Sequence, residues 1–316
     1  TALPNVTVRT GVAVSGLTGD TGRITGVTCE GGQPIGAALV VDATGRGSRS
    51  DRWLSALGCP TPPVTEIVNG VGYASRLLAR DGELGDLTAV FVLPAPPDET
   101  AAGLVVPVED GRWLVSLGAW HGGVPVDEQS FAAHAAALPA PHVAEVLSAA
   151  APLTAIHVHR LPSNRRRHFE NLTTAPAGYA AIGDAMCSFN PIYGQGMTCA
   201  ALEALTLDRL LTRHGPAADA RFTHAYHKAA AALLKTPWSF AAGGDLRWPQ
   251  TTGPRTGGSR LLNGYTSRVL SASVVDPQVR RVFTAVQHLL LPPSALLRPS
   301  VVRRVLRATR RRRQPS

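Results

Sequence analysis

One stretch of the chain combines a carboxylate with several glycines at spacings that suit a bound ligand. Its candidate ligand-binding residues are Gly183, Asp184, Pro191, Gly194, Gln195, Gly196 and Met197. Apolar residues precede Gly183 and an alanine-rich segment follows Gly196, and this order predicts a strand, a loop and a helix. Asp184 can accept hydrogen bonds from hydroxyl groups, while amides at the helix start can approach an anion or a ring. By spacing alone, a plain turn with a capping aspartate explains the pattern equally well.

The complete pattern resembles the second flavin motif of the FAD-dependent aromatic hydroxylase superfamily, which includes monooxygenases, epoxidases and reductases. The resemblance rests on Gly183-Asp184-Ala, on Pro191 and on the turn formed by residues 194–197. It implies that Asp184 contacts the ribityl chain of FAD. It also implies that Pro191 and the turn lie beside the isoalloxazine ring, with the turn facing its pyrimidine edge.

A second candidate segment follows the short apolar run 37–41, which predicts a strand buried on both faces. Gly45 and Gly47 approximate the dinucleotide fingerprint G-x-G-x-x-G, but Ser50 replaces its third glycine. The segment is more similar to the Asp-Gly segment that the same superfamily carries at the end of its nucleotide domain, with extra spacing between Asp42 and Gly45. This resemblance implies that Asp42 and Gly45 lie near the cofactor.

Size and composition limit the classes of protein to which the chain can belong. With 316 residues and a mass of 33.1 kDa, it can bury a full core and form two lobes. The four cysteines show neither C-x-x-C spacing nor paired histidines, so we expect no disulfide framework and no metal site. No apolar run approaches the roughly 20 residues of a membrane helix, so we expect no membrane span and a cytoplasmic location.

The formal charge of +9 is concentrated near the C-terminus. Seven of the positive charges belong to Arg303, Arg304, Arg307 and residues 310–313. We interpret the run of four arginines at residues 310–313 as a solvated, disordered end, because aromatic residues do not interleave with the arginines. We therefore expect no nucleic-acid partner, and a basic nucleic-acid binder is a distant alternative that rests on this tail alone.

Alternating apolar residues predict several strands. Valines from residue 6 to residue 14 suggest extended strands, and a turn at 19–22 precedes a strand at 24–29. Further strands are predicted at 70–78, 89–93, 104–108, 113–117 and 155–160, with the pair 104–108 and 113–117 forming a hairpin. His157 and His159 share one face of the last strand, which we interpret as a plain sheet face and not as a metal site. Residues 165–167, three arginines, are interpreted as a surface loop.

Helical spacing dominates the second half of the chain. In the helix predicted from Gln195 to Arg213, the expected buried face consists of Ala200, Ala204, Leu207 and Leu211, with Glu203 and Thr206 on the other side. Further helices are predicted at 130–150, 217–235, 259–273, 277–291 and 294–310, with Pro237 among the residues that separate them. The segment from Trp238 to Trp248 is expected to cover a core.

These elements predict an α/β (α+β mixed) fold. It comprises a partial FAD-binding Rossmann-like domain, an inserted substrate domain with a mixed sheet, and C-terminal helices. The predicted segments are 1–58 and 176–214 for the FAD-binding domain, 59–175 for the substrate domain, 215–308 for the helical region and 309–316 for a basic tail.

The superfamily's first motif, a G-x-G-x-x-G that binds the FAD pyrophosphate, is absent from the sequence. Because the chain begins at Thr1 in an extended pattern, we expect a fragment that lacks the first βαβ unit. Each missing amide hydrogen bond contributes about 1 kcal/mol or more, so we expect the isolated chain to bind FAD weakly.

The resemblance implies a monooxygenase that uses FAD, takes electrons from NAD(P)H and hydroxylates or epoxidises a small organic substrate with molecular oxygen through a flavin hydroperoxide. The C-terminal arrangement is similar to that of the bacterial epoxidase-like branch, which includes the epoxidases of polyether biosynthesis, a form of secondary metabolism. Two alternatives stay open: a reductase of the geranylgeranyl type and a non-catalytic remnant. No residue receives a catalytic assignment at this point, because the cofactor supplies the oxygen chemistry.

Overall fold

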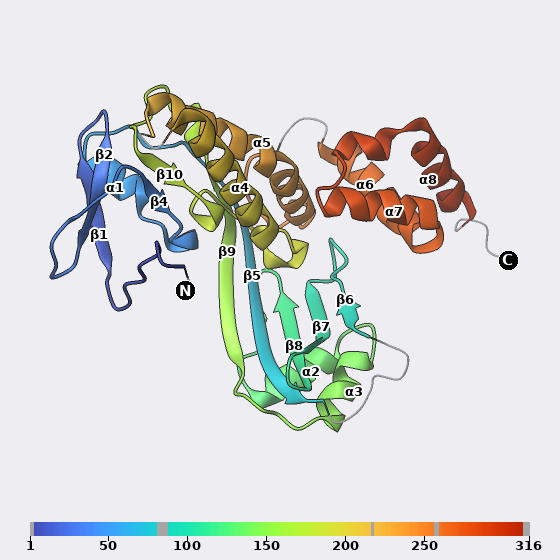
Figure 1. Cartoon of the computed structure of the whole chain (residues 1–316). Coiled ribbons are helices and arrows are strands. Elements are labelled where there is room, and N and C mark those ends of the chain that lie inside the picture. Colours follow the sequence, from blue (N-terminus) through green and yellow to red (C-terminus); the bar gives the residue numbers. More distant parts are fainter. Residues whose placement is uncertain (1–2, 81–87, 216–217, 256–258, 312–316) are drawn as a thin grey trace. The chain divides into compact units, whose positions relative to one another are not determined.

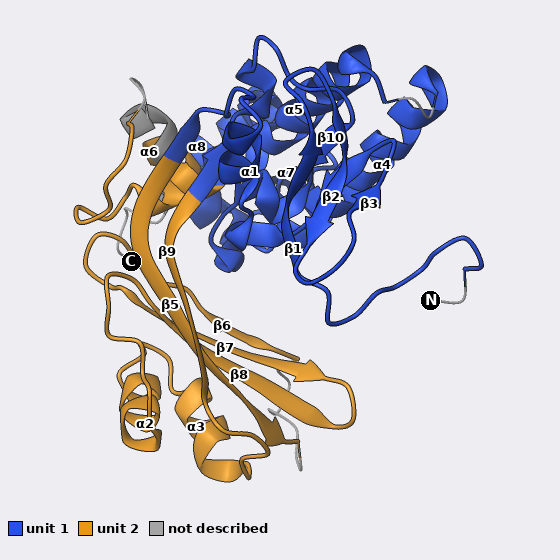
Figure 2. Ribbon diagram, turned by 90° about the vertical axis from the view of Figure 1, so that its left-hand side faces the viewer, with its two compact units in different colours: residues 1–65, 165–240, 269–316 blue, residues 66–164, 241–268 orange. Residues whose placement is uncertain are grey.

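A computed structural model of the chain describes residues 3–80, 88–215, 218–255 and 259–311 (Figure 1). The chain forms two compact units (Figure 2). Unit 1 contains residues 1–65, 165–240 and 269–316, and unit 2 contains residues 66–164 and 241–268. The predicted substrate segment 59–175 therefore encloses the first part of unit 2, and the predicted C-terminal helical region is divided between the units.

Unit 1 begins with a small antiparallel sheet of β1 (Val14–Gly19), β2 (Ile24–Cys29) and β3 (Ile35–Gly36). The predicted turn between β1 and β2 is confirmed, and the Asp20 carboxylate holds it by accepting hydrogen bonds from two backbone amides. The strands predicted from residue 6 to residue 12 are wrong. Val6, Val8 and Val12 are exposed, and their segment pairs with no strand in the described part of the chain. An alternating pattern forms a strand when a partner strand is available, and this segment has none among the described residues.

A two-stranded parallel sheet of β4 (Val40–Asp42) and β10 (Tyr179–Ala181) joins the two predicted motifs. The prediction of a strand buried on both faces is wrong for β4, because Val41 is 39% exposed in this narrow sheet. Short turns follow each strand: η1 (Gly45–Gly47) after β4, and η3 (Gly183–Ala185) after β10. β11 (Cys187–Ser188) and η4 (Pro191–Tyr193) then lead to the predicted helix.

The helices α1 (Ser50–Ala56), α4 (Gly196–His214) and most of α5 (Ala220–Asp245) belong to unit 1, as do α7 (Pro277–Gln287), η5 (Pro293–Leu297) and α8 (Pro299–Arg311). The predicted break at Pro237 is wrong, because α5 continues through this residue. α6 (Ser259–Val275) crosses the limit between the units in the sequence. None of the helices in the described ranges is long and apolar enough to cross a bilayer.

The buried face of α4 differs from the predicted one. Its buried residues are Cys199, Glu203, Thr206 and Leu210. The prediction placed alanines and leucines on this face, but α4 packs against η3 through the face that carries Glu203, which accepts a hydrogen bond from the Gly183 amide. A carboxylate therefore lies inside the fold, and its partner is described below.

Unit 2 is built on antiparallel strands with two helices packed against them. β5 (Val64–Ala79) pairs with β8 (Arg112–Ala119), β8 pairs with β7 (Ala101–Val108), and β7 pairs with β6 (Val90–Val92). The predicted hairpin is β7 and β8. The helix predicted at 130–150 is two helices, α2 (Glu128–Ala136) and α3 (His142–Ala149). Alternate residues of the strands, such as Val115 and Leu117, form one core with Phe131 of α2 and Val143 of α3.

β9 (His157–Arg167) carries both the paired histidines and the arginine cluster. His157 and His159 are exposed two residues apart, on one face of the strand as predicted. The described residues contain no group of three side chains placed to bind a metal ion. The surface-loop interpretation of residues 165–167 is wrong, because they lie in β9 and Arg167 is 1% exposed. As expected for the segment from Trp238 to Trp248, Trp248 is buried and stacks on Trp120.

Candidate functional site

Two loops that are far apart in the sequence meet where β4 and β10 end. The parallel register pairs Ala181 with Asp42, and the Ile182 amide continues it by donating to the Asp42 carbonyl oxygen at 3.0 Å. The loops that follow, η1 and η3, contact each other. Ligands of open α/β sheets bind beyond the carboxyl ends of such strands. The structure thus brings together the candidates Asp42 and Gly45 with Gly183 and Asp184.

The Asp42 carboxylate is buried and fully used inside the protein. Its Oδ1 accepts hydrogen bonds from the Thr44 amide at 3.0 Å and from the Thr44 hydroxyl at 2.6 Å. Its Oδ2 accepts from the hydroxyls of Ser48 at 2.6 Å and Tyr179 at 3.0 Å. Burial, followed by the nearby Asp42 charge, raises the pKa of Tyr179 well above its ordinary value, which keeps this phenol a donor. Asp42 therefore holds the loop 42–48 against β10.

Asp184, by contrast, presents an exposed carboxylate. It makes no hydrogen bond or ion pair within the described ranges. Partial loss of water raises the pKa of this carboxyl, and the positive charge of Arg46 opposes the shift. The Arg46 guanidinium donates to the Ser188 hydroxyl at 3.1 Å, which places a cation from the first loop beside the second. Sequence reasoning missed Arg46, since an arginine inside a glycine-rich turn gives no signal of its own.

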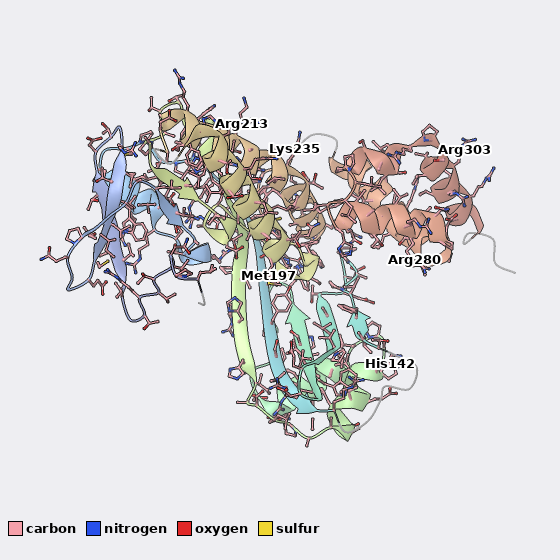
Figure 3. The ribbon with its side chains drawn as sticks, viewed as in Figure 1. His142, Met197, Arg213, Lys235, Arg280 and Arg303 are labelled. Atoms are coloured by element: carbon pink, nitrogen blue, oxygen red, sulfur yellow. The ribbon has the colours of Figure 1, made fainter. Side chains whose placement is uncertain are left out.

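The start of α4 lies next to the Asp184 carboxylate. A Cβ added at Gly196 would be 4.0 Å from the Asp184 Oδ1. No described side chain caps this end of α4 and its first turn has no acidic residue, so its first amides stay open to an acceptor. Gly194 has a φ of +66°, which favours glycine, and a Cβ there would meet only open space. Pro191 is exposed, and Met197 in the first turn is 89% exposed (Figure 3).

Gln195 points into the protein and away from the exposed turn. Its side chain is 6% exposed, and its Nε2 donates to the carbonyl oxygen of Gln287 at 2.7 Å. Gln195 thus ties the turn to the last residue of α7. Of the residues in the predicted turn, the glycines and Met197 are the ones whose surfaces are available to a ligand.

Arg167 is a residue of this site that the sequence analysis did not find. Its Nη2 donates to the Ser48 carbonyl oxygen at 3.0 Å, and its Nη1 donates to the Ala185 carbonyl oxygen at 2.8 Å. Its Nε contacts the Asp51 carboxylate at 3.1 Å. One buried guanidinium therefore links the loop after β4 to the loop after β10. Three consecutive arginines show no periodicity that separates a strand from a loop, and the partners of Arg167 are distant in the sequence.

Glu203 of α4 holds the loop after β10 through a hydrogen bond to its backbone. Its Oε2 accepts a hydrogen bond from the Gly183 amide at 2.6 Å, and its Oε1 is buried without a partner in the described structure. Burial raises the pKa of this carboxyl to about 7, although the hydrogen bond from Gly183 opposes the shift and the charge of Asp184 adds to it. Gly183 has a φ of +60°, so the turn that carries Asp184 depends on a glycine and on this buried acceptor.

Comparison with known sequences gives one substantial match. No family model matches the chain. Protein Rv3254 of Mycobacterium tuberculosis is 30% identical over 295 residues, which cover 89% of this chain and 61% of that protein. The chain thus spans about three fifths of the length of this relative.

Comparison with solved structures shows the fold. The flavin-dependent brominase Bmp2 matches with a TM-score of 0.62 and 12% identity, over 96% of this chain and 71% of the brominase. A flavoprotein/dehydrogenase from Cytophaga hutchinsonii matches with a TM-score of 0.65 and 14% identity, over 94% and 68% of the two chains. HpxO from Klebsiella pneumoniae, solved with FAD and uric acid, matches with a TM-score of 0.52 and 19% identity, over 94% and 66%. The predicted α/β flavoprotein fold is confirmed.

Proposed function

We propose that this chain, which has the fold of flavin-dependent oxygenases and halogenases, acts as an FAD-dependent monooxygenase. The observation that carries the proposal is the exposed Asp184 carboxylate, which has no hydrogen-bond partner within the described ranges, beside a start of α4 that no described side chain caps. A carboxylate accepts hydrogen bonds from ribityl hydroxyls, and the amides of α4 together with Arg46 are donors for the acceptor groups of a flavin. The residues present therefore suit FAD in both charge and hydrogen-bonding character.

The other candidate residues divide into those that would touch FAD and those that would hold the loops in place. Asp184, Pro191 and the turn residues Gly194, Gly196 and Met197 have surfaces that a ligand can reach. Asp42 and Gln195 are buried and hydrogen-bonded internally, so we propose that they act by positioning the backbone. Gly45 has a φ of +74° with open space at its Cβ position, and its backbone would approach the cofactor.

When bound, FAD would supply the electron transfer and the activation of molecular oxygen, with NAD(P)H as the reductant. The protein's own contribution is to bind the ribityl chain at Asp184, to orient the ring against the start of α4 and to keep the loops rigid through Arg167. A small organic substrate would receive one oxygen atom by hydroxylation or epoxidation. Oxygen consumption that matches NAD(P)H oxidation and requires substrate would support this reaction, whereas a product that gains hydrogen without oxygen would refute it.

Titration of FAD with the purified chain, followed by flavin fluorescence, tests the site itself. Asp184→Ala should weaken binding by roughly 10- to 100-fold, because a hydrogen bond to a charged group contributes about 1.5–3 kcal/mol. Asp184→Asn keeps one acceptor oxygen and should lose less. The matched control is Asp208→Ala, which removes an exposed carboxylate from α4 of the same unit and should bind as the wild type does. Equal affinities for Asp184→Ala and the wild type would refute the assignment.

A further inference from the structure

Residues 269–316 of unit 1 carry a high concentration of positive charge. They contain ten arginines and a single acidic residue, Asp276, which gives a formal charge of +9. The other 268 residues contain 21 basic and 21 acidic side chains, so the whole net charge of the chain belongs to this segment. We call its described part, residues 269–311, the basic helical segment.

The basic helical segment is a folded group of helices, in agreement with the helices predicted at 277–291 and 294–310. Residues 312–316 of the predicted basic tail lie outside the described residues. α7, η5 and α8 contact one another and lie together at the red end of the colour range in Figure 1. On α8, Val301 and Val305 are buried one turn apart. Arg303 and Arg307 lie on the opposite side of the helix and are exposed, and Arg303 is at its outer surface in Figure 3.

Several arginines of the basic helical segment have no side-chain partner among the residues that the structure describes. Arg280 donates to carbonyl oxygens at the end of α6, and Arg304 pairs with Asp276 at 3.2 Å. The guanidinium groups of Arg281, Arg298 and Arg307 are exposed and make neither a hydrogen bond nor an ion pair with described residues. These three charges are free to meet an external anion.

Large apolar side chains are exposed in the same segment. They are Leu270, Val274, Val275, Leu290, Leu297 and Leu306. Leu290 is 77% exposed and Leu297 is 59% exposed, and Leu306 precedes Arg307 on α8. Exposed arginines mixed with exposed aliphatic residues are typical of surfaces that enter the headgroup region of anionic membranes. A nucleic-acid surface would favour aromatic residues for stacking on bases, and Phe283 is the sole aromatic residue in the sequence of this segment.

We propose that the basic helical segment docks on the surface of a membrane that contains anionic lipids. The free arginines contact the lipid phosphates and carboxylates, and the exposed leucines enter the boundary between headgroups and acyl chains. This inference is independent of the proposed function, since it uses neither the candidate site nor FAD.

Sedimentation with lipid vesicles tests the docking surface. The wild-type chain should bind vesicles of phosphatidylcholine mixed with phosphatidylserine, should bind pure phosphatidylcholine much less, and should lose affinity as salt is added. The triple variant Arg281→Glu, Arg298→Glu, Arg307→Glu should bind about 100-fold more weakly or worse, which corresponds to about 1 kcal/mol for each arginine removed.

The control is a variant with the same change in net charge at exposed arginines of α4 and α5: Arg209→Glu, Arg213→Glu, Arg221→Glu. It should keep wild-type binding, and matching thermal melts of both variants will show that they fold. A second variant, Leu290→Ser with Leu297→Ser, should bind more weakly while keeping its salt dependence. The proposal is overturned if the wild type does not bind the mixed vesicles or if the two triple variants bind them equally well. It is also overturned if the wild type binds duplex DNA more tightly than these vesicles at the same salt concentration.

Discussion

Replacing Glu203 with glutamine should change how the stability of the protein depends on pH. In the folded protein, burial holds the pKa of the Glu203 carboxyl at about 7, against an ordinary value of 4.5. The groups that face it are Asp184 on η3, Cys199 on α4, Cys187 on β11 and Tyr226 on α5. None of them supplies a positive charge that would stabilise the ionised carboxylate.

The sign of the effect follows from proton binding. Between pH 4.5 and 7 the folded state holds a proton on Glu203 that the unfolded state has lost, so stability falls as pH rises through this range. The difference of 7 − 4.5 in pKa corresponds to about 3 kcal/mol. Glutamine keeps an oxygen that can accept the Gly183 amide but has no proton to lose. Relative to the wild type, Glu203→Gln should therefore gain about 3 kcal/mol in unfolding free energy between pH 4.5 and pH 8.

Thermal unfolding at a series of pH values, followed by circular dichroism, measures this gain. About 3 kcal/mol corresponds to a relative shift of roughly 6–12 °C for a unit of this size. Glu30→Gln, at an exposed glutamate of the same unit, is the control and should follow the wild-type profile. Parallel profiles for Glu203→Gln and the wild type would refute the reasoning that a buried, ionisable carboxyl supports the Gly183 turn.

Two further predictions concern buried basic side chains. Arg167→Ala should lower the unfolding free energy measured in urea by about 3–5 kcal/mol, because two loop carbonyls lose their buried charged donor and Asp51 keeps Arg165 alone of its two described ion-pair partners. Arg165→Ala removes a partly exposed ion pair and should cost less than about 1 kcal/mol, and similar losses for both variants would contradict the role of Arg167. Burial lowers the pKa of the His227 imidazole to about 4 in the folded protein. Between pH 6.5 and pH 4 the unfolded chain binds a proton on this imidazole and the folded protein does not, so the unfolding free energy should fall by about 3 kcal/mol as pH drops through this range. His227→Gln should reduce that dependence. The NMR signal of the His227 imidazole is the one that this variant lacks, and if that signal titrates near pH 6.5 in the folded wild type, the prediction is wrong.

Local signals in the sequence were enough to predict the hairpins and most of the helices. The turn between β1 and β2 and the hairpin of β7 and β8 depend on glycine and aspartate chemistry within a few residues, which a sequence displays directly. The strand, loop and helix around Asp184 were predicted for the same reason. Pairing partners are not local, and for that reason the exposed Val41 and the unpaired valines near the N-terminus were misassigned.

Sequence reasoning missed the parts of the site in which a buried polar side chain forms a hydrogen bond with a backbone atom that is distant in the sequence. Glu203 was placed on the solvent side of α4 because a charged residue ordinarily belongs there, yet it accepts the amide of Gly183. Arg167 was placed in a loop, yet it donates to carbonyl oxygens in two separate segments. These backbone partners can be identified once the strand register is known, because the register places the distant loops beside Glu203 and Arg167. Helical spacing carries no information about them.

The bond between Tyr179 and Asp42 also has a consequence for the order of folding. These side chains are 137 positions apart in the chain, so β4 and β10 can pair after a long loop has closed. The hairpins of unit 2 lie within that loop and join neighbouring residues, and contacts of this kind form sooner. During synthesis, Asp42 can meet Thr44 and Ser48 at once, but Tyr179 becomes available when most of unit 2 has left the ribosome. The two loops of the candidate site therefore come together late, so a nascent chain that ends before Tyr179 would have half of the site and nothing to hold a ligand against it.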